Sequence, residues 1–335
     1  MIQTELARPG KVAYSQGSQR RFPEGRSRSR HAERFFQEGE DFVGDTAVTN
    51  RAFQSVQRQP LFNLSADRGW AQRFQLAVAD VHDGFKLWRL SWILGLSDIK
   101  LRYRGSALGP FWLTLSTAIM IGSMGVLYAY LFHVKVHNYL PYISVSIVFW
   151  NYLNTLITEG CNCFIQADAL IRGTRMPFTV HALRSVVRNT IVLAHNLLVI
   201  VGVFLVMGVH VSWFALWSIP ALLLWLVDAY AISLLFGALC ARFRDVPQII
   251  MALLQVVFFV TPIMWYAKLL ESNPRSDLLI RFNPFYYMLD IVQAPLLGLP
   301  MTIDVVLKAL IVSAGIILVS AIGFARIRGR IAYWV

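Results

Sequence analysis

The acidic and cysteine residues that could support catalysis or metal binding are few and scattered along this chain. Asp80 and Asp83, in the run Asp-Val-His-Asp, come nearest to the paired carboxylates that general acid–base chemistry uses. Cys161 and Cys163 have the spacing of half a metal site, but no second Cys or His pair stands nearby, so we favour a structural role. The chain has no G-x-x-x-x-G-K-S/T loop and does not cradle nucleotide phosphates by that route.

Asp228 is the one acidic residue inside a long apolar run. A carboxylate at the centre of a membrane costs about 2.5–3.5 kcal/mol on insertion scales, so the side chain is expected to face protein or water. A proton relay is one interpretation. Pairing with His195 or with an amide on the preceding span is the other, and we favour the pairing.

The composition indicates the environment in which these residues must work. The 335 residues are 56% hydrophobic and 15% charged, whereas a soluble domain has roughly 25% charged residues. The net charge is +12, but 17 of the 31 Lys and Arg precede residue 111 and the others sit mainly at the ends of apolar runs. This pattern is typical of an integral membrane protein and excludes a nucleic-acid-binding face and a soluble enzyme.

Six apolar runs are each long enough to cross a membrane, which takes about 20 residues as a helix. The sequence therefore predicts an all-α integral membrane protein. The expected spans are 109–132, 137–158, 189–209, 213–241, 246–267 and 304–325. Basic residues concentrate in the loops after the second and fourth spans and in the C-terminal tail, so both termini are expected to be cytoplasmic.

The chain before the first span divides into two segments. Residues 1–78 are polar and Arg-rich without apolar periodicity, and such a segment is expected to be a disordered cytoplasmic tail. Residues 79–102 mix apolar and aromatic residues with a few basic ones, which predicts an amphipathic helix in the membrane interface. Trp88 and Trp92, four residues apart, favour the interface over a short buried helix. Residues 103–335 form the predicted six-span domain.

Four short stretches carry a family resemblance. Residues 103–112 read Tyr-Arg-Gly-Ser-Ala-Leu-Gly-Pro-Phe-Trp, where the interfacial helix gives way to the first span. The other three are Met-Pro-Phe at 176–178, Ala-Arg-Phe-Arg-Asp-Val at 241–246, and Thr-Pro-Ile-Met at 261–264 followed by Asn-Pro at 283–284. In this order on six spans, they resemble type-2 ABC exporter permeases, in particular those that export O-antigen, capsular or teichoic acid polymers. The resemblance covers about residues 80–330.

The resemblance implies a permease subunit that exports a lipid-linked cell-surface polysaccharide across the bacterial inner membrane. ATP and Mg would be bound by a separate ATPase subunit, and this chain would carry no cofactor or metal. Because six spans enclose little space, two copies of the permease are expected to pair and to join two ATPase subunits. The other expected partners are the lipid-linked polysaccharide and membrane lipids.

The turn into the first span is the first candidate site. Cations at headgroup depth can pair with the diphosphate of a lipid-linked substrate, although positive-inside anchoring explains the same arginines equally well. Gly105 and Gly109 allow a tight bend, and Pro110 suits the first turn of the next helix. The residues expected to admit the lipid head are Arg102, Tyr103, Arg104, Ser106 and Gly109.

The loop after the second span is the second candidate site. In the family this loop provides a coupling helix that docks on the ATPase, and residues 169–172 are expected to form a short helix that Gly173 ends. A solvated linker is disfavoured because the apolar side chains of 170, 171, 176 and 178 would be exposed. The expected ATPase contacts are Asp168, Leu170, Ile171, Arg172, Gly173, Arg175, Met176 and Pro177.

A third group is expected to have structural or conformational roles. It comprises Asp228, Arg242, Arg244, Asp245, Pro262, Asn283 and Pro284. An Arg–Asp contact is expected to hold the turn at 242–245. Pro262 should interrupt the fifth span, and by the resemblance residues 268–302 form re-entrant or gate helices. The aromatic residues at 265–266 and 285–287 are interpreted as an interface belt, with a sugar-stacking surface as the alternative.

Other functions remain as alternatives at this stage. A type-2 ABC permease for a lipid, a drug or teichoic acid has the same architecture. A membrane glycosyltransferase would need convergent carboxylates, for which only Asp80 and Asp83 are available. An ion-coupled transporter usually has several charges inside the membrane, whereas this chain has one.

Overall fold

The computed structural model describes residues 69–106, 109, 111–267 and 274–335, so most of the predicted N-terminal tail lies outside the described residues. Every regular element in these ranges is a helix, which confirms the all-α prediction. In chain order, the first four helices of the described residues are α3 (Trp70–Lys86), α4 (Trp88–Arg102), α5 (Phe111–Leu131) and α6 (Val136–Asn162). They are followed by α7 (Asp168–Gly173), α8 (Phe178–Met207), η2 (Trp213–Trp217), α9 (Ser218–Arg242) and α10 (Val246–Val260). The last are α11 (Pro274–Arg281), α12 (Pro284–Leu296), α13 (Ile303–Ile327), η4 (Arg328–Arg330) and α14 (Ile331–Trp334).

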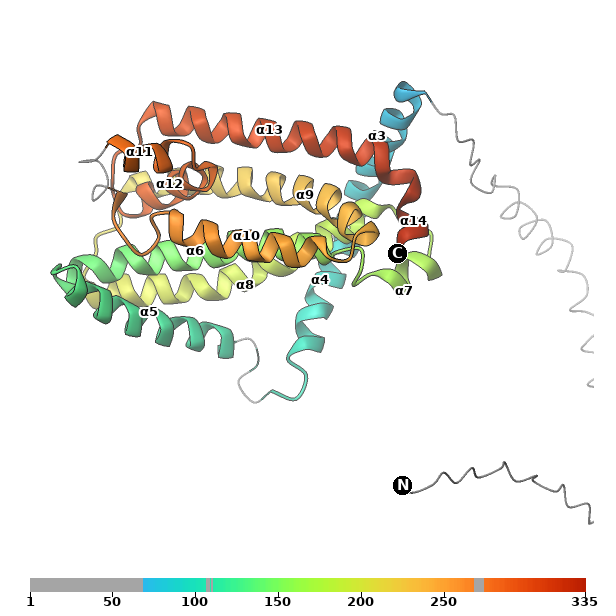
Figure 1. Cartoon of the computed structure of the whole chain (residues 1–335). Helices are drawn as coiled ribbons and strands as arrows, with labels where there is room; N and C mark the ends of the chain where they lie inside the picture. The colour runs from blue at the N-terminus through green and yellow to red at the C-terminus, as the bar shows by residue number, and fades with distance from the viewer. Residues whose placement is uncertain (1–68, 107–108, 110, 268–273) are drawn as a thin grey trace, which may run out of the picture. The chain divides into compact units, whose positions relative to one another are not determined.

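Five helical segments are long and apolar enough to cross a membrane, and α10 is a shorter apolar helix. The five correspond to α5, α6, α8, η2 with α9, and α13 with the elements after it. They lie side by side in Figure 1, where α7 and α14 lie at one end and α11 and α12 at the other. We call these the basic end and the distal end.

Two helix ends differ from the limits predicted for the spans. The third span was expected to start at residue 189, but α8 begins at Phe178. Arg184 and Arg188 lie in the first three turns of α8. Both guanidinium groups are paired with acids, so the helix can start before these charged residues. The fifth span was expected to reach residue 267, but α10 ends at Val260, because Pro262 keeps Thr261 extended (φ −85°, ψ 137°).

The predicted interfacial helix consists of two helices. Helix α3 begins at Trp70 rather than at residue 79. The helical conformation is interrupted at Leu87, and α4 begins at the next residue. Ala77, Asp80 and Gly84 are the buried residues of α3, with the spacing of one helix face. This buried face contains a carboxylate and small residues instead of large apolar ones. It therefore lacks the apolar pattern that would have predicted an earlier helix start.

Helix α4 packs closely on α8 through small residues. Ser91 and Gly95 are buried, and the Ser91 hydroxyl donates to the carbonyl oxygen of Val180 at 3.3 Å. The large apolar side chains of Trp88 and Trp92 are 56% and 45% exposed on the rest of the helix. A soluble helix would bury such residues, so this surface fits contact with the membrane interface.

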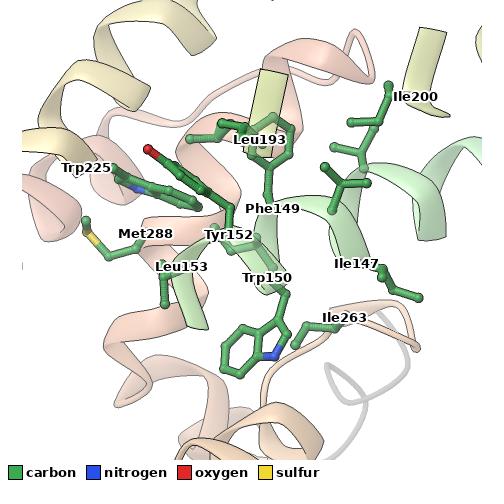
Figure 2. Packing of buried hydrophobic residues seen from close by; sticks show 14 of the residues in the cluster. Ile147, Phe149, Trp150, Tyr152, Leu153, Leu193, Ile200, Trp225, Ile263 and Met288 are labelled. Carbon is green, nitrogen blue, oxygen red and sulfur yellow. The ribbon is translucent and has the colours of Figure 1, made fainter. Parts of the chain in front are cut away.

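Helix α6 is the centre of the hydrophobic core. It packs against α5, α8 and α9, and most of its spanning segment is buried. Figure 2 shows Phe149, Tyr152 and Trp225 packed together, and the ring of Tyr152 is stacked on that of Trp225 with centroids 6.3 Å apart. A second, smaller cluster at the basic end holds Phe164, Ala238 and Ile331, which joins the C-terminal helix α14 to α9.

Candidate functional site

The turn between α4 and α5, residues 102–110, is the access turn of the predicted substrate path. The φ angles of Gly105 and Gly109 are 87° and 55°, which confirms the tight bend expected at these glycines. The Ser106 N–H donates to the carbonyl oxygen of Tyr103 at 3.0 Å, and the Ser106 hydroxyl oxygen accepts from the Gly109 N–H at 3.2 Å. Pro110 lies outside the described residues. Among the described residues of the turn, these backbone and serine hydrogen bonds hold its ends together.

The two arginines of the access turn have different surroundings. Nη2 of Arg102 lies 3.1 Å from Oε1 of Glu159, so this cation is already paired with α6. Arg104 is exposed and forms no ion pair with any residue in the described ranges. Of the two, Arg104 is the guanidinium available for an external anion.

A network of five charged residues lies behind the access turn. Arg188 of α8 is its centre: its Nη1 lies 3.0 Å from Oδ2 of Asp98 on α4, and its Nη2 contacts Glu159 on α6. Arg184 donates to the same Asp98 through Nε at 2.7 Å, and Arg102 completes the set. The network joins α4, α6 and α8 at one depth and has an excess of one positive charge, three arginines against two acids.

The environment of Asp98 stabilises its ionised form. Burial alone would raise the pKa of the Asp98 carboxyl, but the hydrogen bonds and charges of Arg184 and Arg188 together outweigh burial and lower this pKa below its ordinary value. The side chain is therefore a permanent anion at neutral pH. It serves as the acidic partner of two arginines from α8.

The carboxylates of Asp80 and Asp83 do not converge on one site. Asp80 is 3% exposed, and its Oδ1 accepts from the Thr179 backbone N–H at 3.1 Å, in the first turn of α8. Its Oδ2 lies 2.8 Å from Nε of Arg328. Asp83 is exposed and lies 3.5 Å from Lys86 of its own helix. This pair is therefore no acid–base dyad, and Asp80 anchors α3 to the start of α8.

The predicted coupling segment contains the short helix α7, and Gly173 is its last residue. Ile171 and Phe178 pack against the second hydrophobic cluster, so these two of the four apolar side chains do not need a partner subunit to cover them. The exposed surface of the segment is polar and positively charged instead. Its exposed residues are Ala169, Arg172, Gly173, Thr174 and Arg175.

The C-terminal helix connects α7 to the turn between α9 and α10. Nη2 of Arg172 contacts the backbone oxygen of Val335, while Nε of the same guanidinium lies 2.5 Å from Asp168. Trp334, the residue before, has the guanidinium of Arg242 5.0 Å from its ring centroid. A displacement of α7 would therefore reach the start of α10 through α14.

The predicted Arg–Asp contact in the turn at 242–245 is absent. Asp245 pairs with neither Arg242 nor Arg244 in the described part of the chain, and it precedes α10 without a side-chain cap. Arg242 lies over the rings of Phe243 and Trp334 instead, each centroid at 5.0 Å. Cation–π contact is more favourable there because the guanidinium stacks on two aromatic faces.

Asp228 is buried as expected, but its predicted partner was wrong. Its Oδ1 accepts from the hydroxyl of Ser313 on α13 at 2.6 Å, whereas Nδ1 of His195 lies 2.8 Å from the carbonyl oxygen of Ile191 on its own helix. Asp228 is on the face of α9 that packs against α13. The contact joins the fourth span to the last one.

The turn at 261–264 and the start of α12 form one unit at the distal end. The amide of Asn283 donates to the Thr261 hydroxyl at 2.8 Å, and its Oδ1 accepts from the Phe285 N–H at 3.0 Å. The Tyr142 hydroxyl donates to the Pro262 carbonyl oxygen at 2.9 Å. Pro284 occupies the first turn of α12, where a missing N–H costs little.

Three of the five aromatic residues that were interpreted as an interface belt pack against other side chains or backbone of the protein, namely Tyr266, Phe285 and Tyr287. The ring of Tyr266 lies 4.4 Å from that of Tyr142, and the ring of Phe285 lies 5.9 Å from that of Trp150. Tyr287 is 6% exposed and donates to the Arg281 carbonyl oxygen at 2.9 Å. The Phe285 contact joins α12 to α6, the Tyr287 contact joins α12 to α11, and the Tyr266 contact joins the segment after α10 to α6.

Comparison with known proteins identifies the family. The ABC-2 type transporter model matches residues 89–297, from α4 through the end of α12. The chain belongs to the ABC-2 type transporter family. It is 24% identical over 199 residues to the O-antigen export system permease protein RfbA of Myxococcus xanthus, covering 59% of this chain and 76% of that relative. The RfbA protein of Klebsiella pneumoniae is 23% identical over 193 residues, covering 57% and 74%.

The ABC-2 match includes α4, the access turn, α7 and the charged network, and it begins after α3. Sequence reasoning did not identify Asp98 and Glu159 as site residues. A usable signal existed, because Asp98 precedes Arg102 by four residues and Arg184 precedes Arg188 by four, the spacing of neighbours on one helix face. Glu159 was overlooked because it directly follows an apolar run.

Proposed function

We propose that this ABC-2 chain is the permease subunit of an exporter that moves a lipid-linked cell-surface polysaccharide across the bacterial inner membrane. The observation that carries the proposal is the family match over 89–297 together with relatives named O-antigen export system permeases. A separate ATPase subunit binds ATP and Mg and drives the movement. We assign both termini to the cytoplasm, and the C-terminal helix α14 lies at the basic end (Figure 1).

The access turn receives the head of the lipid carrier in this proposal. Arg104 is exposed and has no acidic partner in the described ranges, so its guanidinium can bind a phosphate in a bidentate manner. Tyr103, Ser106 and Gly109 shape the turn, and Gly105 and Gly109 adopt the positive φ angles that its bend needs. Arg102 has a different task, because Glu159 holds it.

Helix α7 contacts the ATPase, and exposed positive charge supports this assignment. Arg172 of α7 is exposed, and so are Thr174 and Arg175 just after its end. When the ATPase subunits close on ATP, α7 moves, and α14 passes the movement to the turn before α10 through Arg172 and Arg242. The charged network links α8 and α6 to the access turn at the same level.

Two copies of the chain form the path for the glycan. Helix α5 exposes Ile119, Leu127 and Tyr130, and α10 exposes Val256 and Phe259, which leaves apolar surface on two spans for a second copy or for lipid. Two ATPase subunits then serve one path. Thr179 and Arg328 hold Asp80, so Asp80 and Asp83 do not form the carboxylate pair that a glycosyltransferase was expected to use.

The test is to delete the gene in its host and to follow the surface glycan and the cytoplasmic lipid-linked pool together. The proposal predicts loss of the surface polymer and accumulation of full-length lipid-linked chains inside. Loss of both pools would contradict it and indicate a defect in synthesis. If neither pool changed in a strain without a second exporter, the substrate would be a lipid or a drug instead.

A further inference from the structure

The open face of α6 is polar, although α6 is the most buried of the five long spans. Between Pro141 and Cys161, the residues that are not buried all carry a polar group, and they are Tyr142, Asn151, Asn154, Thr155, Thr158 and Glu159. Helices α5, α10 and α13 instead expose mainly large apolar side chains, for example Leu127, Phe259 and Ile311. Unpaired polar groups are costly in hydrocarbon, so a lipid-facing surface is apolar. The open face of α6 is therefore not suited to lipid.

Four of these residues form a stripe on the half of α6 nearer the basic end, which we call the amide stripe. Asn151, Asn154, Thr155 and Thr158 occupy positions i, i+3, i+4 and i+7, so they lie on one face of the helix. The Thr155 and Thr158 hydroxyls donate to backbone oxygens of their own helix at 2.7 and 2.9 Å. In the described part of the chain, the side-chain amides of Asn151 and Asn154 have no partner, and both remain accessible. The stripe thus offers two free amides and two hydroxyl oxygens that can still accept.

Helix α5 does not cover this half of α6. Gly125 of α5 lies so close to the first turns of α6 that an added Cβ would be 2.2 Å from Cδ1 of Leu140. At its start, α5 contacts a different helix, because the ring centroid of Phe111 lies 5.9 Å from that of His195 on α8. Helix α5 therefore crosses from α6 to α8, and the amide stripe lies beyond the part of α6 that it covers.

The amide stripe begins at the access turn. Glu159, the residue after Thr158, pairs with Arg102 of that turn. Asn151 precedes Glu159 by eight residues, which is about 12 Å along a helix. The stripe is therefore continuous with the proposed entry of the lipid head and leads from it into the span. This continuity favours the exported chain over a second copy of the permease as the occupant of the stripe.

The helices that carry and flank the stripe have no positive charge. Residues 111–131, 136–162 and 246–260, which form α5, α6 and α10, contain no Lys or Arg. Gln255 of α10 adds an exposed amide at a similar depth, because the ring of Phe258, one turn later, lies 5.7 Å from that of Trp150 on α6. Pores that conduct anions are lined by Arg or Lys. This surface therefore matches an uncharged chain that is rich in hydroxyl groups.

We propose that the amide stripe lines the path of the exported polymer and binds uncharged sugar units through their hydroxyl groups. This role rests on the export function proposed above and narrows the substrate to a neutral glycan. A side-chain amide both donates and accepts, as a sugar hydroxyl does, so Asn151 and Asn154 replace hydrogen bonds that the sugar loses with water. A polyanion such as teichoic acid finds no cation on the stripe, and a lipid leaves the amides unpaired.

The first experiment tests whether the stripe is in contact with water. Thr155→Cys is placed in the full chain, whose three natural cysteines are buried, and inverted inner-membrane vesicles are treated with a charged maleimide that does not cross membranes. Leu318→Cys is the control, because Leu318 is 62% exposed on the apolar surface of α13. Thr155→Cys should be labelled about tenfold more than the control, because the reactive thiolate forms in water and not in hydrocarbon. Labelling no stronger than that of the control would overturn the proposal and show that lipid or a second copy covers the stripe.

The second experiment tests the charge of the chain that passes the stripe. Thr155→Asp and Thr155→Lys introduce opposite charges at the most exposed position of the stripe. ATP-driven uptake of a neutral glycan into inverted vesicles should be slowed to a similar extent by both. A polyanion would be blocked by the aspartate and would still pass the lysine, because like charges repel. Uptake that depends on the sign of the introduced charge would overturn the neutral-glycan assignment.

The third experiment replaces the amides. Asn151→Leu combined with Asn154→Leu should slow glycan uptake about tenfold, the effect of losing one or two hydrogen bonds to the sugar. Asn151→Gln combined with Asn154→Gln should retain most of the rate, since the amides remain. Asn196→Leu is the matched control, because Asn196 is a half-buried asparagine of α8 outside the stripe. All variants should co-purify with the ATPase like the wild type.

The two proposals fail in different ways. Uptake at the wild-type rate by the leucine pair would overturn the role of the amide stripe and leave the export function standing. Absence of uptake by the wild type itself would instead refute the export function.

Discussion

Nη2 of Arg102 lies 3.1 Å from Oε1 of Glu159, so the last turn of α4 is joined to the last turn of α6 by an ion pair. Glu159 also contacts Arg188, which reaches Asp98 on α4. The helix that leads into the access turn is thus tied to two membrane spans. Arg102 is part of the framework, whereas Arg104, two residues later, is exposed and forms no ion pair with a described residue.

Arg104→Ala is expected to lower export strongly, because it removes the unpaired guanidinium of the access turn and no described contact within the chain. Surface polymer and co-purification with the ATPase should be measured together, and only the first should fall. Lys100→Ala is the control, an exposed cation on α4 outside the turn. Normal surface polymer in Arg104→Ala would end the lipid-head assignment.

Arg188→Met is expected to destabilise the protein by about 2–3 kcal/mol, because it removes the buried central cation from two half-buried carboxylates that keep Arg184 and Arg102. Thermal unfolding of the purified protein measures this change. Arg102→Met should cost less than about 1 kcal/mol, since the Arg102 side chain is 46% exposed and its pair is screened by solvent. Similar losses for both variants would show that the network has no buried centre.

Asp98 gives the protein a predictable acid sensitivity. Its pKa is lowered in the folded state, because its two arginines outweigh burial, so it contributes stability that is complete above the ordinary Asp pKa of about 4. This contribution disappears as the pH falls through the lower folded pKa. Unfolding temperatures between pH 7 and pH 3 should therefore drop more steeply in the wild type than in Asp98→Asn. Parallel curves would contradict this role.

Gly84→Ala should separate α3 from α8. A Cβ at this position would lie 1.7 Å from Oγ1 of Thr179, whose hydroxyl donates to the carbonyl oxygen of Asp80 at 2.8 Å. A loss of about 1–3 kcal/mol in unfolding free energy is expected. Gly202→Ala, with open space at its Cβ, should be neutral or stabilise by up to about 1 kcal/mol. Equal effects would refute the close approach.

Arg175→Glu is expected to weaken co-purification of the ATPase several-fold, because it reverses an exposed charge at the end of α7 that has no described partner. The variant should keep the wild-type unfolding temperature. Arg244→Glu, also exposed but in the turn before α10, provides the comparison. An unchanged complex would place the ATPase contact elsewhere.

The sequence was sufficient for the parts of the fold that depend on local chemistry. Hydropathy located the long spans, and the glycines at 105 and 109 marked the bend. The start of α8 was misplaced because Arg184 and Arg188 were taken to lie outside the span. The end of α10 was misplaced because Pro262 was expected to interrupt the span without ending the helix. In both cases the deciding contact or conformation was not visible in hydropathy alone.

Partners between helices were harder to predict from the sequence. The partner of Asp228 was expected on the preceding span, but Asp228 bonds to Ser313, 85 residues later. Which residue becomes the partner depends on which face of α9 packs against which neighbouring helix. Arg242 pairs with an aromatic ring of α14 in place of Asp245 for the same reason. One helical pattern indicates that a buried polar group needs a partner, but only the packing of several helices identifies it.

ATP-driven uptake of the lipid-linked glycan into inverted inner-membrane vesicles tests the central claim most directly. Vesicles from the host should protect the glycan from added glycosidase only when ATP is present, and vesicles from the deletion strain should not. Restoring the wild-type gene should restore protection, and restoring Arg104→Ala should not. Equal protection in vesicles with and without this chain would contradict its role as the export permease.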